Sequence, residues 1–535
     1  MAKKILHGEE ARQALKRGID AVANVVRITI GPRGRNVVLD KGYGSPTITN
    51  DGVTIARDIT LADKFENMGA EIVKEVAGKT NDVAGDGTTT SVVLTQALAE
   101  AGFKKAAAGV NAMEMRRGIE AATRDAVEAL KKLAKPTKTD EEIRQAATIS
   151  AESVDIGSII AETIKKIGKD GVVTVEESQS FGITSDVVEG LQFEKGYLSH
   201  YFVTNPERLE AEYRDPAILL TDKKISTVKE LLPLFEKLAA TGKKDLVIIA
   251  DDVDGEALTT FVLNKLRGSF NILAVKAPGF GDKKKDYLAD IAVTVGAKVI
   301  SDDTGLTFEK ADLSVLGRAA RIVSRKDTTT IVGGKGTRAA VSARVTALKA
   351  QRTAATSKYE KEQLDERIGK LSGGVAVIKV GAATETEMKY LKLKIEDAVN
   401  ATKAAIAEGI VMGGGAALAK VSQKMMEAFA STKENDFAMG YKVLIDALQA
   451  PLRQIARNVG KDEGVVVHAV MHGEEKSGYN ALTDTYVEDM FAEGIIDPVK
   501  VTRAALEHAA SAVAMLLTTE VAIAEEETTS PQPLS

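Results

Sequence analysis

The chain has 535 residues, of which 44% are hydrophobic, and a formal net charge of −5 at pH 7. This length allows more than one domain with a large core, and the slightly acidic charge argues against the basic surface that nucleic-acid binding requires. No cysteine is present, which excludes disulfides and thiolate metal sites.

The first part of the chain is predicted to be mostly helical. Apolar side chains recur at helical spacing over residues 11–26, and this pattern ends at Gly31–Gly34. Two short strands are expected next, at Asn36–Asp40 and Thr47–Thr49. Alanine-rich helices then fill most of the sequence to Lys135.

The middle of the chain alternates between strand and helix patterns. Strands are expected at Leu246–Ala250, Asn271–Ala277 and Ala297–Ser301, and helices at Val228–Ala239, at Gly255–Arg267 and from Asp282 onward. Strands that alternate with helices indicate a parallel or mixed α/β sheet.

Two charged helices, Ala340–Lys349 and Tyr359–Leu371, are expected to form an antiparallel hairpin after this sheet. From Gly373-Gly374 onward the alanine-rich helical pattern returns and runs to about Ala524. The last residues, Glu525–Ser535, are polar and contain proline, so we expect a disordered tail. This order fits an α/β domain inserted into a helical one.

Two patterns that resemble binding motifs are interpreted as structural. His468 and His472 share a helical face, but the third protein ligand that a zinc site usually needs is not visible nearby. Gly333–Thr337 lacks the Gly-Lys-Ser/Thr ending of a phosphate loop, which favours a hairpin turn.

The sequence also predicts a soluble protein of the cytoplasm. Residues 1–8 contain two lysines without an apolar stretch behind them, so we expect no secretory signal. The most apolar late stretch, Ser511–Ala524, is interrupted by Glu520 and is too short to span a bilayer.

The stretch Ala84–Thr90 places two glycines, one acid and three threonines where a helix pattern begins. A helix N-terminus leaves backbone N–H groups unpaired and carries partial positive charge, so it binds phosphates. Gly85 and Gly87 allow close approach of the backbone, and Asp86 can meet phosphate through Mg²⁺. The stretch therefore predicts a metal–triphosphate site, with an ordinary capped loop as the alternative.

Other segments favour the nucleotide interpretation. Thr29–Pro32 is a second glycine-containing loop after a helix, and Asn50–Gly52 offers another carboxylate at a turn. Gly413–Gly415 allows close backbone approach before a helix, and Asp397 lies on a helical pattern as an acid that could activate water.

Six motifs, in the same order along the chain, closely resemble those of the bacterial group I chaperonins, the GroEL class. They are Thr47–Val53, Ala84–Thr90, Val275–Asp282, Gly373–Glu385, Glu408–Gly415 and Gly478–Ala481.

The resemblance implies a multidomain α and α/β fold with three domains. They would be a helical equatorial ATPase domain (1–133 and 409–524), an intermediate domain (134–189 and 375–408) and an α/β apical, substrate-binding domain (190–374), followed by the tail 525–535. Pro136 with Gly409, and Gly190 with Gly373-Gly374, match the two hinges of the family.

The resemblance also implies partners and ligands. Two stacked heptameric rings, a small GroES-like co-chaperonin lid and unfolded polypeptide as substrate are expected, without nucleic acid or membrane. The expected ligands are ATP, Mg²⁺ and K⁺.

By position, the resemblance assigns the following residues. The phosphate contacts are Thr29, Ile30, Gly31, Pro32, Asp86, Gly87, Thr88, Thr89 and Thr90. The nucleoside contacts are Gly414, Asn480, Ala481, Leu482 and Asp497. Asp51 and Asp397 are the water-activating carboxylates, Asp86 is the Mg²⁺ ligand, and K⁺ lies near Thr29, Asn50 and Thr89. Client and lid contacts are Tyr197, Tyr201, Phe202, Leu232, Phe235, Leu258, Val262 and Leu263.

Two of the apical helix patterns carry wide apolar faces, which supports the client assignment. The apolar side chains of Val228–Ala239 span roughly 160° and those of Gly255–Arg267 roughly 200°, where a surface helix needs about 100°. Either both helices expose apolar surface or both are buried on two sides.

This chain departs from the family pattern at three places. Asn50 stands where well-known members have lysine, and the spacing from Asn480 to Asp497 is one residue longer than usual. The tail is acidic and lacks Gly-Gly-Met repeats.

Two other functions compete with a folding chamber. A metabolic ATPase would need an acid, base or nucleophile cluster in the α/β insert, and none is visible. A ring scaffold with a dead nucleotide site conflicts with the intact acids Asp51, Asp86 and Asp397.

Overall fold

The computed structural model describes residues 2–40, 46–168, 171–206, 208–430 and 433–525. The chain divides into two compact units, one of residues 1–162, 177–183 and 380–535, the other of residues 163–176 and 184–379. They are called unit 1 and unit 2, and each is described by itself. None of the described helices is long and apolar enough to cross a membrane.

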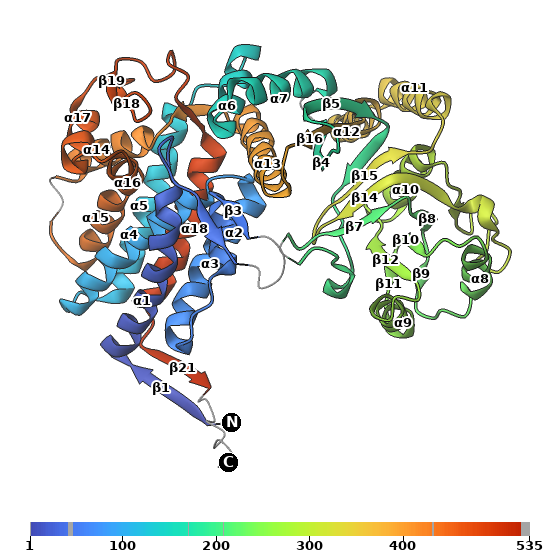
Figure 1. Ribbon diagram of the computed structural model, residues 1–535, viewed down its shortest axis with the longest axis horizontal. Helices are drawn as coiled ribbons and strands as arrows, with labels where there is room; N and C mark the ends of the chain where they lie inside the picture. The colour runs from blue at the N-terminus through green and yellow to red at the C-terminus, as the bar shows by residue number, and fades with distance from the viewer. Residues whose placement is uncertain (1, 41–45, 169–170, 207, 431–432, 526–535) are drawn as a thin grey trace. The chain divides into compact units, whose positions relative to one another are not determined.

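Unit 1 is built mainly of helices (Figure 1). They are α1 (Gly8–Val26), α2 (Gly52–Asp58), α3 (Lys64–Ala84), α4 (Thr88–Ala107), α5 (Ala112–Leu133), α6 (Asp140–Ala151), α13 (Glu385–Glu408), α14 (Ala416–Phe429), α15 (Asp436–Ala447), α16 (Ala450–Val459), α17 (Glu463–His472) and α18 (Val499–Leu516). Its antiparallel strand pairs are β1 (Lys3–His7) with β21 (Val521–Glu525), β2 (Val37–Leu39) with β3 (Thr47–Thr49), β17 (Ile410–Met412) with β20 (Ile496–Pro498), and β18 (Gly478–Asn480) with β19 (Thr485–Val487).

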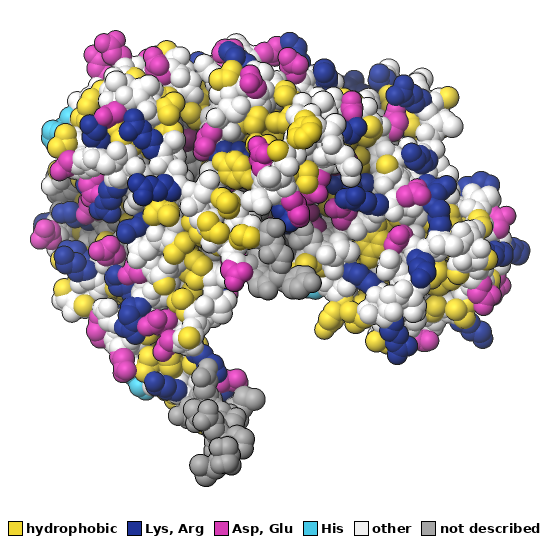
Figure 2. Space-filling view, viewed as in Figure 1, with side chains coloured by type: hydrophobic (Ala, Val, Ile, Leu, Met, Phe, Trp, Pro, Cys, Tyr) yellow, Lys and Arg dark blue, Asp and Glu magenta, His cyan; other side chains and the backbone are white. Residues whose placement is uncertain are grey.

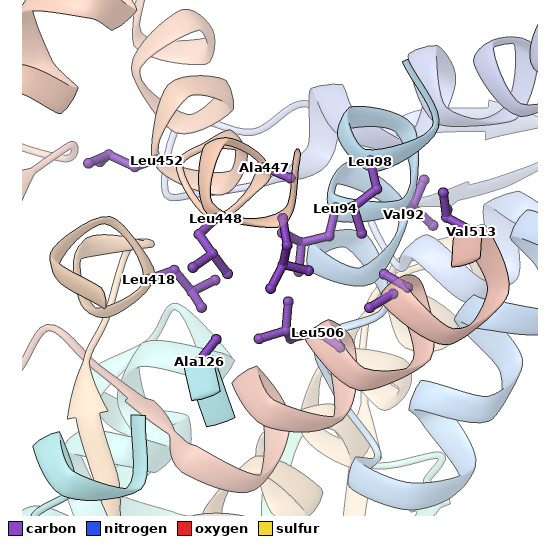
Figure 3. Packing of buried hydrophobic residues seen from close by; sticks show 14 of the residues in the cluster. Val92, Leu94, Leu98, Ala126, Leu418, Ala447, Leu448, Leu452, Leu506 and Val513 are labelled. Carbon is purple, nitrogen blue, oxygen red and sulfur yellow. The ribbon is translucent and has the colours of Figure 1, made fainter. Parts of the chain in front are cut away.

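Helix α4 runs through the core of unit 1 and contacts α1, α3, α15, α16 and α18. Its buried side chains point in several directions, as expected for an interior helix. Figure 3 shows Leu94 and Leu98 of α4 in one cluster with Leu448, which follows α15, and Leu506 of α18. Burial of each such leucine contributes about 1.5–3 kcal/mol, so the core fixes α4 firmly.

Two glycines allow helices α5 and α15 of this unit to approach with their backbones nearly touching. At the crossing of α5 and α15, a Cβ on Gly440 would lie 2.0 Å from the Met115 carbonyl oxygen, and a Cβ on Gly118 would lie 2.1 Å from that of Phe437. Neither position has room for even one methyl group.

The first and last described strands, β1 and β21, lie side by side (Figure 1). One face of this pair, with Leu6 and Ala522, packs against Phe65 of α3. On the other face, Ile5 and Ile523 stand opposite each other and are about half exposed.

Unit 2 contains a mixed eight-stranded sheet. The main order is β12-β10-β8-β14-β15-β6, with β13 beside β8 and β7 beside β14. The strands are β6 (Gly190–Phe193), β7 (Ala211–Arg214), β8 (Ala217–Thr221), β10 (Asp245–Ala250), β12 (Asn271–Lys276), β13 (Val299–Ile300), β14 (Gly317–Ser324) and β15 (Thr329–Gly334). Strands β8, β10, β12 and β13 are parallel, and β14 is antiparallel to its neighbours. The predicted mixed α/β sheet is confirmed.

The other elements of unit 2 are α8 (Leu232–Ala240), α9 (Gly255–Leu266), α10 (Asp282–Val295), α11 (Arg338–Ala354), α12 (Lys358–Gly373) and the short pair β9 (Lys224–Ile225) and β11 (Asp252–Val253). The predicted hairpin of charged helices is present as α11 and α12. Its buried Arg367 donates to Asp290 of α10, as Arg344 also does, which ties the hairpin to α10.

Four elements lie across the division between the units along the chain: α7 (Val154–Ile167), β4 (Val172–Glu177), β5 (Gly182–Val188) and β16 (Val375–Gly381). Their strands form one sheet of order β4-β16-β5. The predicted apical segment, 190–374, lies wholly within unit 2, and the three-domain division itself stays a prediction.

Three local predictions were wrong. Helix α8 begins at Leu232 rather than Val228, with Pro233 in its first turn. The late helices end at Leu516, and Val521–Glu525 is a strand because it pairs with β1. Gly333–Thr337 joins β15 to α11 and is no hairpin turn. The predicted tail lies outside the described residues except for Glu525.

We expect Gly440→Ala to destabilise unit 1 by about 1–3 kcal/mol, because the added methyl overpacks the contact with α5. The measurement is the free energy of unfolding by urea. Gly78→Ala in α3 is the matched control, since its Cβ would meet nothing closer than 3.7 Å, and a helical alanine there should stabilise by up to ~1 kcal/mol. Equal effects of the two exchanges would contradict the packing argument.

Candidate functional site

Unit 1 contains a cavity of about 410 Å³ at the N-terminus of α4. Its lining includes every residue that the sequence predicts to contact nucleotide or to activate water. These residues are Thr29, Ile30, Gly31, Pro32, Asn50, Asp51, Asp86, Gly87, Thr88, Thr89, Thr90, Asp397, Gly414, Asn480, Ala481, Leu482 and Asp497. Segments that are almost 470 positions apart in the sequence thus meet around one space.

The first turn of α4 opens on this cavity without a capping side chain. Its N-cap is Gly87, which has a left-handed backbone (φ 80°) and forms no side-chain hydrogen bond. Gly85 is also left-handed (φ 69°), and a Cβ there would lie 2.4 Å from Asn400. Only glycine suits both demands. The turn therefore presents backbone donors and partial positive charge to the cavity, as an anion site requires.

Hydroxyl and carboxylate groups line the wall beside this turn. Asp51 caps α2 by accepting from the backbone N–H groups of Val53 and Thr54, at 3.3 and 3.0 Å. The Thr88 hydroxyl lies 3.5 Å from the same carboxylate, and the Thr29 and Thr89 hydroxyls are 3.3 Å apart. Asp51 is thereby held in one orientation at the edge of the anion site.

The cavity has two further carboxylates, those of Asp86 and Asp497, and the charge of Asp86 acts on Asp497. Burial raises the pKa of Asp86, although the Gly87 N–H and the Ser150 hydroxyl donate to it. Burial, together with the negative charge of Asp86, raises the pKa of Asp497 to about 7. Without a cation, this end of the cavity therefore resists carrying both negative charges.

These groups fit a magnesium–phosphate complex. Mg²⁺ usually takes one or two carboxylates, phosphate oxygens and water rather than a full protein cage. No group of three histidine, cysteine or acidic side chains that could hold a metal occurs in the described part of the chain. Asp86 can supply the carboxylate, and the uncapped turn of α4 can hold the phosphates.

Several lining residues were missed by sequence reasoning. Lys394 of α13 lies on the cavity wall and forms an ion pair with Glu152 at 2.6 Å. Its positive charge opposes the effect of burial, which raises the pKa of Asp86. Ser150 donates to Asp86 at 3.1 Å. A signal for Lys394 existed, because it precedes Asp397 by three residues on the same helical face. No local signal marks Ser150.

The residues predicted to bind clients lie in unit 2, around α8 and α9. Phe235 of α8 and Phe261 of α9 have ring centroids 5.9 Å apart, so the two helices lie side by side. Figure 2 shows hydrophobic side chains gathered over the α9 edge of this unit. Leu232 is 47% exposed and Leu263 45% exposed, whereas Phe235, Leu258 and Val262 are partly buried against the core.

The resemblance assigns client contacts to Tyr197, Tyr201 and Phe202, but only one of these side chains is exposed. Tyr201 is 65% exposed, but Phe202 is fully buried and Tyr197 is only 7% exposed. Both belong to the core of unit 2. Lys265 of α9 donates to the carbonyls of Tyr201 and Val203, at 3.0 Å each, and holds this turn beside the helix.

The model of one protein family matches this chain. The model described as the TCP-1/cpn60 chaperonin family matches residues 22–527. The match covers most of the chain, including the cavity and the α8–α9 surface.

The raised pKa of Asp497 gives a prediction for the ligand-free protein. An ordinary aspartate pKa is about 3.9, so stability that is present below that pH should be lost as pH rises towards about 7. Between about pH 5 and 8 the thermal midpoint should therefore fall more for wild type than for Asp497→Asn.

Asp484→Asn is the matched control for this measurement. Lys461 and Tyr479 lower the pKa of Asp484 by hydrogen bonding to its carboxylate, so it titrates below this pH window. Its curve should run parallel to that of wild type. If the Asp497→Asn curve is also parallel to that of wild type, the pKa of Asp497 is not raised in the folded protein.

Proposed function

Because the chain belongs to the TCP-1/cpn60 chaperonin family, we propose that it is a folding machine of the group I type, driven by ATP. Chaperonins of this family hydrolyse ATP, act on polypeptides and assemble as rings. The finer proposal is that non-native chains are captured on unit 2 and released into a chamber closed by a small co-chaperonin. The observation that supports it most is the convergence of all predicted nucleotide residues on one cavity.

In this proposal the phosphates of ATP bind at the first turn of α4. The backbone donors there, with the hydroxyls of Thr88, Thr89 and Thr90, complement phosphate oxygens. When bound through Asp86, Mg²⁺ would neutralise the phosphate charge. Asp497, Asn480 and the segment after it would flank the nucleoside.

Asp51 and Asp397 are proposed to act on the attacking water. Both carboxylates line the cavity, and a carboxylate can orient a water molecule and accept its proton. Asp51 is fixed by the N-terminus of α2, whereas Asp397 projects from α13. In this proposal Asp86 contributes to nucleotide binding, whereas Asp51 and Asp397 contribute to hydrolysis.

We also propose K⁺ beside the phosphates, near Thr29, Asn50 and Thr89. These residues offer hydroxyl and amide oxygens on one wall of the cavity, and hard cations prefer oxygen ligands. Asn50 brings no positive charge to this wall, while Lys394 brings one from α13.

The client surface proposed here is the exposed apolar strip of α8, α9 and the Tyr201 turn. It contains Tyr201, Leu232 and Leu263 as its exposed members, with Leu258 and Val262 behind them. Apolar contact is non-directional, so such a strip can accept many sequences. The same strip is the proposed seat of the lid. Tyr197 and Phe202 are left out because they are core residues.

Two stacked heptameric rings are the proposed assembly. The subunit carries apolar side chains on short strand pairs, with Val38 of β2 63% exposed and Ile5 and Ile523 about half exposed. Short open-edged sheets with apolar faces are typical association surfaces, which supports oligomer formation.

The proposed hinges lie where two parts of the chain run side by side. At the first, Lys135 and Ile410 exchange backbone hydrogen bonds of 2.8 and 2.9 Å next to Pro136 and Gly409. At the second, a Cβ on Gly374 would lie 2.7 Å from the Val188 carbonyl oxygen. Gly409 and Gly374 both have left-handed backbones (φ 86° and 63°), and a few such positions between elements can absorb the change in backbone angles that a hinge needs.

Exchange of Asp397 should separate binding from hydrolysis. We expect Asp397→Ala to lose about 10²–10⁴-fold of ATP turnover, the usual worth of general-base help, while nucleotide binding and rings persist. Asp86→Ala should instead abolish Mg²⁺-dependent nucleotide binding. Turnover and equilibrium binding of labelled ATP would be measured for both variants. If Asp397→Ala weakens binding as much as turnover, its proposed role is wrong.

Charged substitutions on the strip should abolish client capture. We expect Leu232→Glu and Leu263→Glu to lose binding of a denatured model protein and of the lid, with rings and basal ATPase unchanged. Val187→Glu on β5, 47% exposed in the wild type, is the matched control and should bind normally. If either strip variant binds clients like wild type, the strip is not the client surface. If a variant unfolds unit 2, the exchanged residue belongs to the core.

A further inference from the structure

Lys420 of α14 is a charged side chain in the interior of unit 1. It is 4% exposed, and its chain neighbours Ala419 and Val421 are fully buried. A buried ammonium is tolerated only when its donors are matched by acceptors. Its position away from the cavity surface leaves it outside the proposed hydrolysis mechanism.

The ammonium group is matched by a single turn of the chain. Nζ donates to the carbonyl oxygens of Gly473 at 2.7 Å and of Glu474 at 2.6 Å, and lies 3.5 Å from the Ser477 hydroxyl. Gly473 is the C-cap of α17, where the helix dipole favours a cation. Lys420 therefore fastens the segment after α17 to α14.

The fastened turn leads directly into the nucleoside wall. Ser477 closes the turn by donating its backbone N–H and its hydroxyl to the Glu474 carbonyl, at 3.0 and 2.7 Å. Strand β18 starts at the next residue, and its Tyr479 and Asn480 line the cavity. The turn is thus directly continuous with the wall.

The helix that carries Lys420 also starts at the cavity. Its helix begins immediately after Gly414 and Gly415, which line the cavity. A Cβ on Gly415 would lie 2.7 Å from the Leu452 backbone nitrogen, so the start of α14 is firmly seated. One ammonium group joins this helix to the turn that precedes the strand carrying Asn480.

We infer that Lys420 is a positioning residue for the nucleoside, which sets the distance between the Gly414 loop and the Asn480 segment. The inference rests on the proposed nucleotide site and names a residue that never touches ATP. The phosphate end depends on α4 and the Thr29 loop, which Lys420 does not contact. Loss of the ammonium should therefore affect nucleoside binding and leave phosphate binding intact.

The test is Lys420→Met, which keeps a similar apolar stem without the donors. The exchange removes the two hydrogen bonds from a charged donor that hold the Gly473–Glu474 turn against α14, and the resulting displacement should weaken binding of MgADP about tenfold. The KM for ATP should rise by the same factor while kcat stays within about twofold, since Asp51, Asp86 and Asp397 are unchanged. Inorganic tripolyphosphate, which has no nucleoside, should bind as to wild type.

Two further variants control the experiment. Lys420→Arg retains donors and should restore MgADP binding. Lys424→Met removes a lysine of the same helix that pairs with Glu475 at the surface, and should change nothing. If Lys420→Met does not assemble, Ser477→Ala takes its place, with MgADP binding weakened about threefold and tripolyphosphate binding unchanged.

Two results would overturn the inference. One is MgADP affinity like that of wild type in the assembled Lys420→Met, or in Ser477→Ala when it replaces that variant. The other is equal weakening of MgADP and tripolyphosphate, which would indicate general loosening of unit 1. Wild-type protein that binds neither ligand would overturn the proposed function itself.

Discussion

The N-terminus of α4 is the constraint on which unit 1 depends. Its first turn has no side-chain cap, and its N-cap glycine is left-handed, so backbone donors open on the cavity. The body of the same helix lies in the core among α1, α3, α15 and α18. Core packing therefore supplies the rigidity that lets an uncapped, polar turn persist. In the proposed function an anion would complete the turn, and the energy that holds the helix would also preorganise phosphate binding.

The acids of the cavity divide into groups with different electrostatics. Asp51 is stabilised by backbone donors of α2. Burial raises the pKa of both Asp86 and Asp497, and the negative charge of Asp86 raises the pKa of Asp497 further. Lys394 partly offsets the charge of Asp86. A cation that binds together with a polyphosphate would relieve this repulsion, so ligand binding and the stability of unit 1 are linked.

Sequence predicted the features that are local in the chain. The strand 246–250 is apolar throughout, and the glycines around Asp86 carry their own conformational signal. The errors have non-local causes. Val521–Glu525 is a strand because residues 3–7 supply its partner, and Phe202 is buried because the sheet of unit 2 covers it. Ser150 enters the cavity only through the packing of α6 against α13, which no short motif reveals.

In the proposed function, the exposed strip on α8 and α9 gives a physical reason for assembly. Leu234, Leu238 and Phe261 anchor the two helices in the core of unit 2, so the exposed strip is not needed for folding. Each exposed side chain offers only about 1.5–3 kcal/mol to a client, and part of that is lost in ordering a flexible chain. One strip would hold a client weakly. Several strips on one ring would raise the effective concentration and make capture firm, and withdrawing them together would make release complete.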